Sequence, residues 1–320
     1  MKTRRRNYNY HETKDNYDET KDRLNDLPDC LLLQILSSLK PKHAVQTCIL
    51  STRWKNLWKH LPRLSIRSRD FKTLEGFTKF MSQMLSVRDD STTPLHTLNV
   101  YLDGFMEPRM LERVLKYVVS HDVKRLLVRV NCDIQHFPSY FFSCHTLTSL
   151  HFYVSRRHLN KPKILFPNSL NLPSLTSLYL DSVTFTGGSE PFSACPRLKS
   201  LMISHCDNLG EQNLCISSTT LVKLKIEKYL NPKNYRKIEL STPNLYSFAF
   251  ISTPFQILCW SQLSYVKDIE IDANMWWNYD EAPSILLSWF QNLADINSLT
   301  ISYTTLQVYC NTICKDVKGY

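Results

Sequence analysis

Apolar residues recur at helical spacing over the first patterned stretch of the chain. A helix is predicted to begin at Pro28, because proline suits the first turn of a helix and Asp26 lies close enough to cap it. We expect this helix to end near Lys40. Its apolar stripe consists of Leu31, Leu32, Ile35, Leu36 and Leu39.

Two more short helices are predicted directly after the first. Pro41 can open the second helix and Ser51 can cap the third, which Pro62 stops. The apolar residues of the second helix are Val45, Cys48 and Ile49. Those of the third helix, all on one side, are Trp54, Leu57, Trp58 and Leu61.

Three helices within about forty residues bury too little surface to form a robust core alone. Either the later part of the chain or another protein must therefore cover the remaining apolar surface. Trp54, Trp58 and Arg53 are residue types that are enriched where proteins dock. We expect a tryptophan-bearing apolar face that needs such a cover.

A connecting helix is predicted within residues 66–93, where apolar residues again follow helical spacing. Its apolar face is expected to cover the first unit of the array that follows, because the ends of stacked arrays need covering. The residues of this face are Phe71, Leu74, Phe77, Phe80, Met81, Met84 and Leu85.

Beyond residue 90 a short unit, apolar-x-x-apolar-x-apolar, recurs nine times. The intervals range from 21 residues (Leu245 to Val266) to 30 residues (Val266 to Ile296). This range is centred on the 20 to 29 residues that are typical of leucine-rich repeats. The nine units begin at Leu95, Val123, Leu147, Leu175, Leu198, Leu221, Leu245, Val266 and Ile296.

The last half of each unit is predicted to be a strand with alternate residues turned inward. Neighbouring strands then pair into a curved parallel sheet with a continuous apolar core, which makes the fold class α/β. The central outward column is chemically mixed and is predicted to contain Asn99, Leu127, His151, Tyr179, Met202, Lys225, Ala249, Glu270 and Thr300.

Composition narrows the classes of function. The net charge of +10 is spread among 29 acidic residues, which favours a solvated basic surface over nucleic-acid binding. The N-terminus contains no apolar signal stretch, so the ten cysteines are expected to be reduced. No window approaches 18 consecutive apolar residues, so no membrane partner is expected. Residues 1–22 have no apolar periodicity and are expected to form a mobile tail.

Motifs for chemistry are absent from the sequence. Cys310 and Cys314 have no second pair at zinc-ligand spacing, and Gly187-Gly188 is isolated from any phosphate-binding pattern. No nucleophile motif accompanies a cysteine. We therefore expect no metal, no cofactor and no catalytic residue.

Several short motifs in the helical region stand in a specific order: Leu27-Pro28-Asp29, Ile35-Leu36, Val45, Leu50-Ser51, Arg53-Trp54 and Leu57-Trp58. With this order, residues 23–64 resemble the F-box of plant F-box/leucine-rich-repeat proteins. Two later segments look like phrases that precede strands in the repeats of the same family, namely Cys195-Pro196-Arg197-Leu198 and Thr242-Pro243-Asn244-Leu245.

The resemblance implies a division into a tail (1–22), an F-box (23–65), a connecting helix (66–93), leucine-rich repeats (94–305) and a C-terminal end (306–320). It also implies a non-catalytic subunit of a Skp-cullin-F-box ubiquitin ligase, in the nucleus or cytoplasm. Its F-box would bind a Skp-type adaptor, and through it a cullin, while the repeats hold an unknown target protein. Residues carried over as adaptor-contacting or F-box-shaping are Leu27, Pro28, Ile35, Leu36, Leu39, Val45, Leu50, Trp54 and Trp58.

Two points stay open at this stage. The sequence does not separate the F-box residues that contact an adaptor from those that hold the helices together. The alternative function is a repeat scaffold or a nucleic-acid-associated protein without a role in ubiquitination. In addition, residues 296–308 resemble the start of the FBD region of relatives, so the array is expected to lack its usual closing segment.

Overall fold

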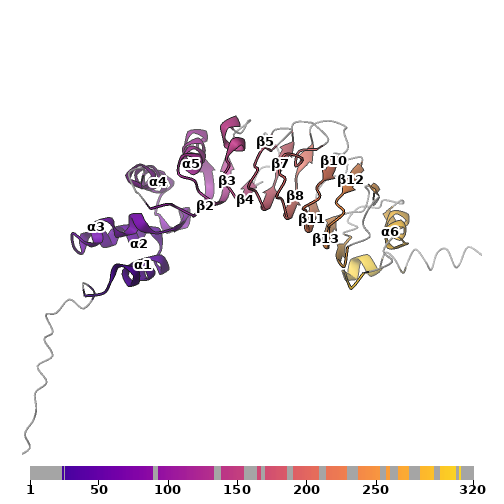
Figure 1. The fold of residues 1–320 in the computed structure, drawn as a ribbon, viewed down its shortest axis with the longest axis horizontal. Coiled ribbons are helices and arrows are strands. Elements are labelled where there is room, and N and C mark those ends of the chain that lie inside the picture. The colour runs from indigo at the N-terminus through magenta and orange to yellow at the C-terminus, as the bar shows by residue number, and fades with distance from the viewer. Residues whose placement is uncertain are drawn as a thin grey trace, which may run out of the picture.

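The computed structural model describes residues 24, 26–88, 93–132, 138–154, 164–166, 170–185, 190–208, 214–228, 237–252, 257–259, 266–273, 282–291, 296–307 and 310. The described residues form an arc with short helices at its N-terminal end and strands along its inner side (Figure 1). The predicted tail, residues 1–22, lies outside the described residues, as does most of the predicted C-terminal end.

The N-terminal region consists of α1 (Asp29–Ser38), α2 (Pro41–Gln46), η1 (Thr47–Ile49), α3 (Trp54–Leu57) and η2 (Trp58–His60). Pro41 opens α2 as predicted. Both predicted caps are wrong, since Pro28 is the N-cap of α1 and Arg53 that of α3, and neither side chain caps its helix. Arg53 instead donates hydrogen bonds to the Asp29 carboxylate and to the Leu27 carbonyl oxygen, each at 2.6 Å.

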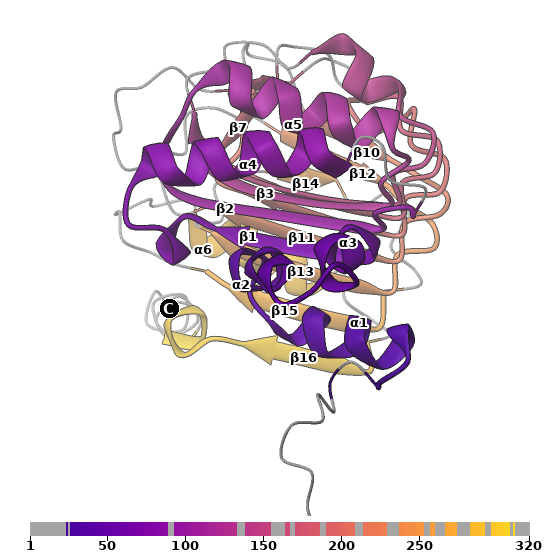
Figure 2. The same ribbon diagram turned by 90° about the vertical axis from the view of Figure 1, so that its left-hand side faces the viewer.

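The segment after these helices begins with a strand, β1 (Arg63–Arg67), and a turn, η3 (Ser68–Asp70). The predicted connecting helix is α4 (Leu74–Arg88), which is shorter than residues 66–93 because the strand occupies the start of that range. The α4 helix buries Phe77, Met81, Met84 and Leu85. It lies beside α5 (Pro108–Ser120) above the first strands of the sheet (Figure 2).

One parallel sheet of ten strands lines the inner side of the arc, and its strand order follows the sequence. All nine predicted units form strands of this sheet, and β1 adds a tenth that the repeat pattern did not predict. The nine are β2 (Thr97–Met106), β3 (Arg125–Cys132), β4 (Ser149–Val154), β6 (Ser177–Asp181), β8 (Ser200–Ser204), β11 (Lys223–Lys228), β13 (Ser247–Ser252), β15 (Asp268–Asp272) and β16 (Ser298–Ile301).

The inward residues of neighbouring strands are paired directly, so equivalent apolar side chains form ladders through the core. Each member of one such buried ladder is at most 2% exposed. Burial of one such side chain contributes about 1.5–3 kcal/mol to the free energy of folding. Contacts between neighbouring repeats can therefore hold the array together. This ladder runs through Leu64, Leu98, Leu126, Leu150, Leu178, Leu201, Leu224, Phe248 and Ile269.

The outer side of the arc changes from helices to short strands along the chain (Figure 1). The first repeats return through α5 (Pro108–Ser120) and η4 (Ser139–Ser143). Later repeats return through two small parallel sheets, and the chain then forms α6 (Ala282–Gln291). The small sheets consist of β5 (Ile164–Phe166), β7 (Val183–Phe185) and β9 (Asp207–Asn208), and of β10 (Leu214–Ser217), β12 (Lys237–Ser241) and β14 (Ile257–Cys259).

The segment predicted to start an FBD region forms β16, the last strand of the sheet in the described chain. Its side chains are less buried than those of the other strands, since Ser298, Leu299 and Thr300 are all exposed. None of the described helices combines the length and the apolar character needed to cross a bilayer.

Candidate interaction surfaces

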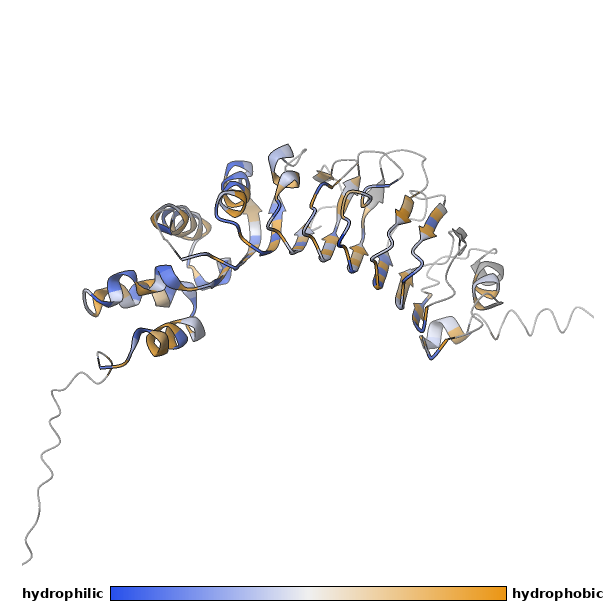
Figure 3. Cartoon of the chain, in the orientation of Figure 1, coloured by the Kyte–Doolittle hydropathy of each residue, from blue (hydrophilic) through white to orange (hydrophobic). Residues whose placement is uncertain are grey.

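Helix α1 and its C-cap residue Leu39 carry one broad apolar stripe, only part of which the core covers. Leu32 and Leu36 point inward and are fully buried. Leu31, Ile35 and Leu39, spaced four residues apart along the outer edge of the stripe, are 43%, 39% and 38% exposed. The chain's own core uses only the inner part of the stripe, so the outer edge is available to a partner. Figure 3 shows the predominantly hydrophobic colouring of α1.

The connection between α2 and α3 exposes two more aliphatic side chains. Ile49 is 85% exposed and Leu50 is 59% exposed. Ile49 is the last residue of the short η1 turn and Leu50 is its C-cap, whose amide donates to the Thr47 carbonyl oxygen and fixes the backbone. Large aliphatic residues at such exposure in a folded segment indicate a docking surface.

The structure sorts the nine residues that the sequence left undivided. Pro28, Ile35, Leu39 and Leu50 are exposed, and Leu27 and Val45 are half-buried. The three buried residues are Leu36, Trp54 and Trp58.

Sequence reasoning gave Leu31 and Ile49 no place among the contact residues, although both are exposed. Their signals were present, because Leu31 precedes Ile35 by one helical turn and Ile49 is adjacent to Leu50. We define the exposed face of the F-box-like helices as the aliphatic face, consisting of Leu31, Ile35, Leu39, Ile49 and Leu50.

The tryptophans do not form an exposed face, so of the two covers that the sequence allowed for them, the later part of the chain supplies theirs and not another protein. Trp54 is 3% exposed and Trp58 is 5% exposed. Both belong to the apolar core that continues from α1 into β1 and the rest of the sheet. The buried Arg88 of α4 donates to the Trp58 carbonyl oxygen at 3.3 Å. The chain's own later segments therefore cover the tryptophans.

The concave face of the sheet carries the outward side chains of the ten strands. The predicted central column is paired residue by residue, and Ser65 of β1 extends it at the N-terminal end. At its centre, the rings of Tyr153 and Tyr179 lie 4.4 Å apart, with His151 5.8 Å from Tyr179. Burial raises the pKa of both tyrosines and lowers the pKa of His151. These rings are therefore uncharged near neutral pH and form an aromatic patch.

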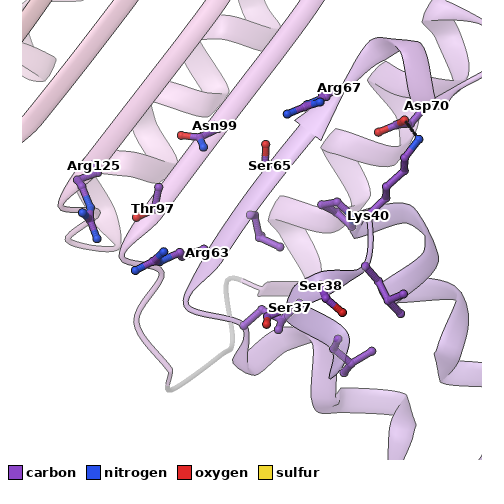
Figure 4. A pocket seen from close by; sticks show the side chains of 15 residues that line it. Ser37, Ser38, Lys40, Arg63, Ser65, Arg67, Asp70, Thr97, Asn99 and Arg125 are labelled. Carbon is purple, nitrogen blue, oxygen red and sulfur yellow. Dashed lines mark hydrogen bonds and ion pairs between the residues drawn. The ribbon is translucent and has the colours of Figure 1, made fainter. Parts of the chain in front are cut away.

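A pocket of about 550 Å³ lies where α1 and the start of α2 overhang β1, β2 and β3. Figure 4 shows Arg63 and Arg125 near its one end and Arg67 near the other. Lys40 forms an ion pair with Asp70 at 2.5 Å across its rim. Its remaining lining includes the polar side chains of Ser37, Ser38, Ser65, Thr97 and Asn99.

The cysteines offer no activated nucleophile among the described residues whose pKa shift is resolved. Burial raises the pKa of Cys195, and its thiol donates to the Leu170 carbonyl oxygen at 3.0 Å. A thiol in this state is a poor nucleophile. The described part of the chain contains no group of three or more histidine, cysteine, aspartate or glutamate residues that could hold a metal ion.

Models of known families match both the N-terminal helical region and the repeats. A family model of the leucine-rich-repeat domain of At1g61320/AtMIF1 matches residues 87–313, which is most of the chain. The chain belongs to this leucine-rich-repeat family. A second family model, the F-box domain, matches residues 24–66, so an F-box precedes the repeats.

Relatives of this F-box/leucine-rich-repeat chain come from Arabidopsis thaliana. FBD-associated F-box protein At1g60410 is 28% identical over 295 residues, which cover 89% of this chain and 71% of that protein. F-box/FBD/LRR-repeat protein At5g22660 is 28% identical over 310 residues, covering 90% and 66%. F-box/LRR-repeat protein 13 is 31% identical over 197 residues, covering 58% and 42%. The chain therefore spans about two thirds or less of the length of several relatives.

F-box domains as a class bind Skp-type adaptors. The combination of an F-box with leucine-rich repeats supports, at this general level, a substrate-adaptor role in ubiquitin ligases rather than catalysis.

Proposed function

We propose that this protein is a substrate-recognition subunit of a Skp-cullin-F-box ubiquitin ligase. The observation that carries the proposal is the aliphatic face, which the chain's own core leaves open to solvent. Leu31 and Ile35 of α1 and Leu39 at its C-cap lie outward, while Leu32 and Leu36 of the same helix are fully buried. An apolar surface of this kind on a folded module is stabilised when a partner covers it.

The F-box would bind a Skp-type adaptor, and the adaptor would connect the protein to a cullin. The concave face of the repeats would hold a target protein for ubiquitin transfer. The chain itself would catalyse nothing and would act by raising the effective concentration of its target near the conjugating enzyme. This role places the protein in the nucleus or cytoplasm, where the ligase acts.

The test is binding of purified Skp-type adaptor to the full chain. Ile49→Asp and Leu50→Asp each place a charge on the aliphatic face, where a carboxylate would be desolvated by the adaptor. We expect at least about a 30-fold loss of affinity, the size of a central interface residue. Calorimetry of adaptor binding measures this loss directly.

Leu306→Asp is the matched control, because Leu306 is 45% exposed and lies near the opposite end of the sheet. It should bind the adaptor like the wild type. Thermal unfolding should show that all three variants keep their fold. Equal adaptor affinity for the wild type and the Ile49 and Leu50 variants would contradict the proposal.

A further inference from the structure

Four arginines stand on the N-terminal part of the concave face. The pairing of β1 with β2 and of β2 with β3 aligns Arg63 with Arg125, and Arg67 with Arg129, on either side of β2. All four are outward residues of their strands and are exposed. We call these four residues the arginine face.

The spacing of the arginine face matches an extended polypeptide. Arg63 and Arg67 are four residues apart on β1, which corresponds to about 13 Å along the strand. The two arginine pairs are separated by two strand spacings, which is about 10 Å. An extended segment that lies over β2 has side chains at positions i and i+4 on one face, also about 13 Å apart. Acidic side chains at these positions would therefore reach both ends of the arginine face.

The floor beneath such a segment is polar and ordered. Thr97, Asn99 and Tyr101 of β2 are its outward residues, and each is half-buried. The Asn99 amide can both donate to and accept from a polypeptide backbone. The Arg67 guanidinium lies 5.1 Å from the centre of the Tyr101 ring, a cation-π contact that helps to hold it in position.

The paired outward positions around the arginine face carry no carboxylate, and Asp103, farther along β2, has its own basic partner. No paired outward position of β1 to β4, all of which the structure describes, carries an aspartate or glutamate. Asp70 forms an ion pair with Lys40, and Asp103 with Arg69, each at 2.5 Å. An incoming carboxylate would therefore meet four guanidinium groups, while the carboxylates of Asp70 and Asp103 already have basic partners.

The other part of the concave face has the opposite character. Of its outward residues from β6 to β15, only Lys223 and Lys225 are basic, and Lys225 lies 3.9 Å from Glu227. The five acidic residues there are Asp181, Glu227, Asp268, Glu270 and Asp272. A long polyanion such as a nucleic-acid strand needs a continuous basic track, which ends here after β3. A short acidic segment needs only the first three strands.

We propose that the arginine face docks an acidic, extended segment of a target protein, which lies over β2 and extends into the pocket beneath α1. The pocket is continuous with the face, since Arg63, Arg67 and Arg125 line both. This inference rests on the proposed function only in naming the occupant as a target. The docking itself does not require the adaptor.

The experiment measures fluorescence anisotropy of a labelled peptide that alternates glutamate and serine, added to the purified full chain. A peptide with glutamine in place of glutamate controls for charge. The wild type should bind the glutamate peptide and not the glutamine peptide. The double variant Arg63→Gln, Arg125→Gln should weaken binding about tenfold or more, because two charge-assisted contacts are lost.

The matched control is the double variant Lys223→Gln, Lys225→Gln, which also removes two positive charges from the concave face. It should bind the glutamate peptide within about twofold of the wild type, because those lysines stand among carboxylates. Equal weakening in both double variants would overturn the proposal, since binding would then follow net charge. No effect of the arginine variant would overturn it as well.

Two further arms separate the alternatives. A single-stranded DNA oligonucleotide of equal charge should compete poorly with the peptide. If the oligonucleotide binds more tightly than the peptide, and this binding also depends on Arg63 and Arg125, the ligand of the arginine face is nucleic acid and the proposal is overturned. Both double variants should bind the Skp-type adaptor normally. Peptide docking by a wild-type chain that fails to bind the adaptor would sustain this inference while contradicting the proposed function.

Discussion

The F-box helices and the strands of the repeats use apolar residues in different ways. In repeat strands such as β2, β6 and β8, buried apolar side chains alternate with less buried ones, so these strands have one buried face and one more exposed face. In α1, the buried Leu32 and Leu36 lie beside the exposed Leu31 and Ile35, so part of the apolar stripe stays open. In the described repeats the stacking of neighbouring strands buries this face, whereas the described F-box helices leave part of their apolar surface exposed.

The largest test of this comparison removes a buried tryptophan from the F-box. Trp54→Ala should lower the free energy of unfolding by about 3–5 kcal/mol, because a large side chain leaves a cavity in a core that includes β1. Urea unfolding followed by circular dichroism measures the change. A loss below about 1 kcal/mol would mean that Trp54 contributes to binding and not to the core.

A second test compares two leucines of opposite exposure. Leu178→Ala in β6 should lower the free energy of unfolding by about 2–5 kcal/mol, because Leu178 is 1% exposed and belongs to the buried ladder. Leu31→Ala on the outer face of α1 should change it by no more than about 0.5 kcal/mol. The same urea titration measures both variants. Similar losses at the two positions would contradict the division into a closed core and an open face.

A third, smaller effect is expected at the N-terminal edge of the F-box. Arg53→Lys should lower the free energy of unfolding by about 1 kcal/mol, because lysine cannot bond at once to the Asp29 carboxylate and the Leu27 carbonyl oxygen. Lys40→Met removes a single ion pair with Asp70 and should have a smaller effect. Thermal unfolding of both variants orders them, and a larger effect of Lys40→Met would contradict this account.

The smallest effect concerns pH and the concave face. Burial lowers the pKa of His151 below its ordinary 6.5, so the unfolded chain binds this proton more readily than the folded one. His151 therefore lowers stability as pH falls below 6.5 and has no such effect at higher pH. His151→Gln should reduce the loss of stability between about pH 7 and pH 5.

Urea midpoints at the two pH values measure this change, and His145→Gln, at an exposed position, controls for the loss of one histidine. An unchanged pH dependence in the His151 variant would show that the half-buried ring has no influence on acid stability.

The repeat units were predictable because their spacing is set by the pairing of neighbouring strands. Leu98, Leu126 and Leu150 stand at equivalent positions in sequence and at paired positions in the sheet. The strand β1 escaped prediction although Leu61, Leu64 and Ile66 follow the same pattern. The helix α4 lies between this unit and the next, so the interval falls outside the expected repeat length.

The division of the F-box residues was less predictable, because it depends on contacts with distant segments. Periodicity places Leu32 and Ile35 on the same short helix but does not say which face meets the rest of the chain. That answer comes from β1 and α4, which close over Trp58 and leave Ile49 outside. The predicted helix caps were wrong for a similar reason. The side chain of Arg53, the N-cap residue of α3, donates to the Leu27 carbonyl oxygen in the segment before α1 and does not cap α3.

The short connection from η2 to β1 fixes where the sheet lies relative to the F-box. Because the last F-box turn leads within a few residues into the first strand of the sheet, and Arg88 ties α4 to Trp58, no free joint separates the two regions. Each added strand therefore increases the distance between the F-box and the C-terminal end of the sheet by about 4.8 Å. A cargo held near β15 would lie roughly 40 Å along the arc from β1, a distance set by the count of repeats.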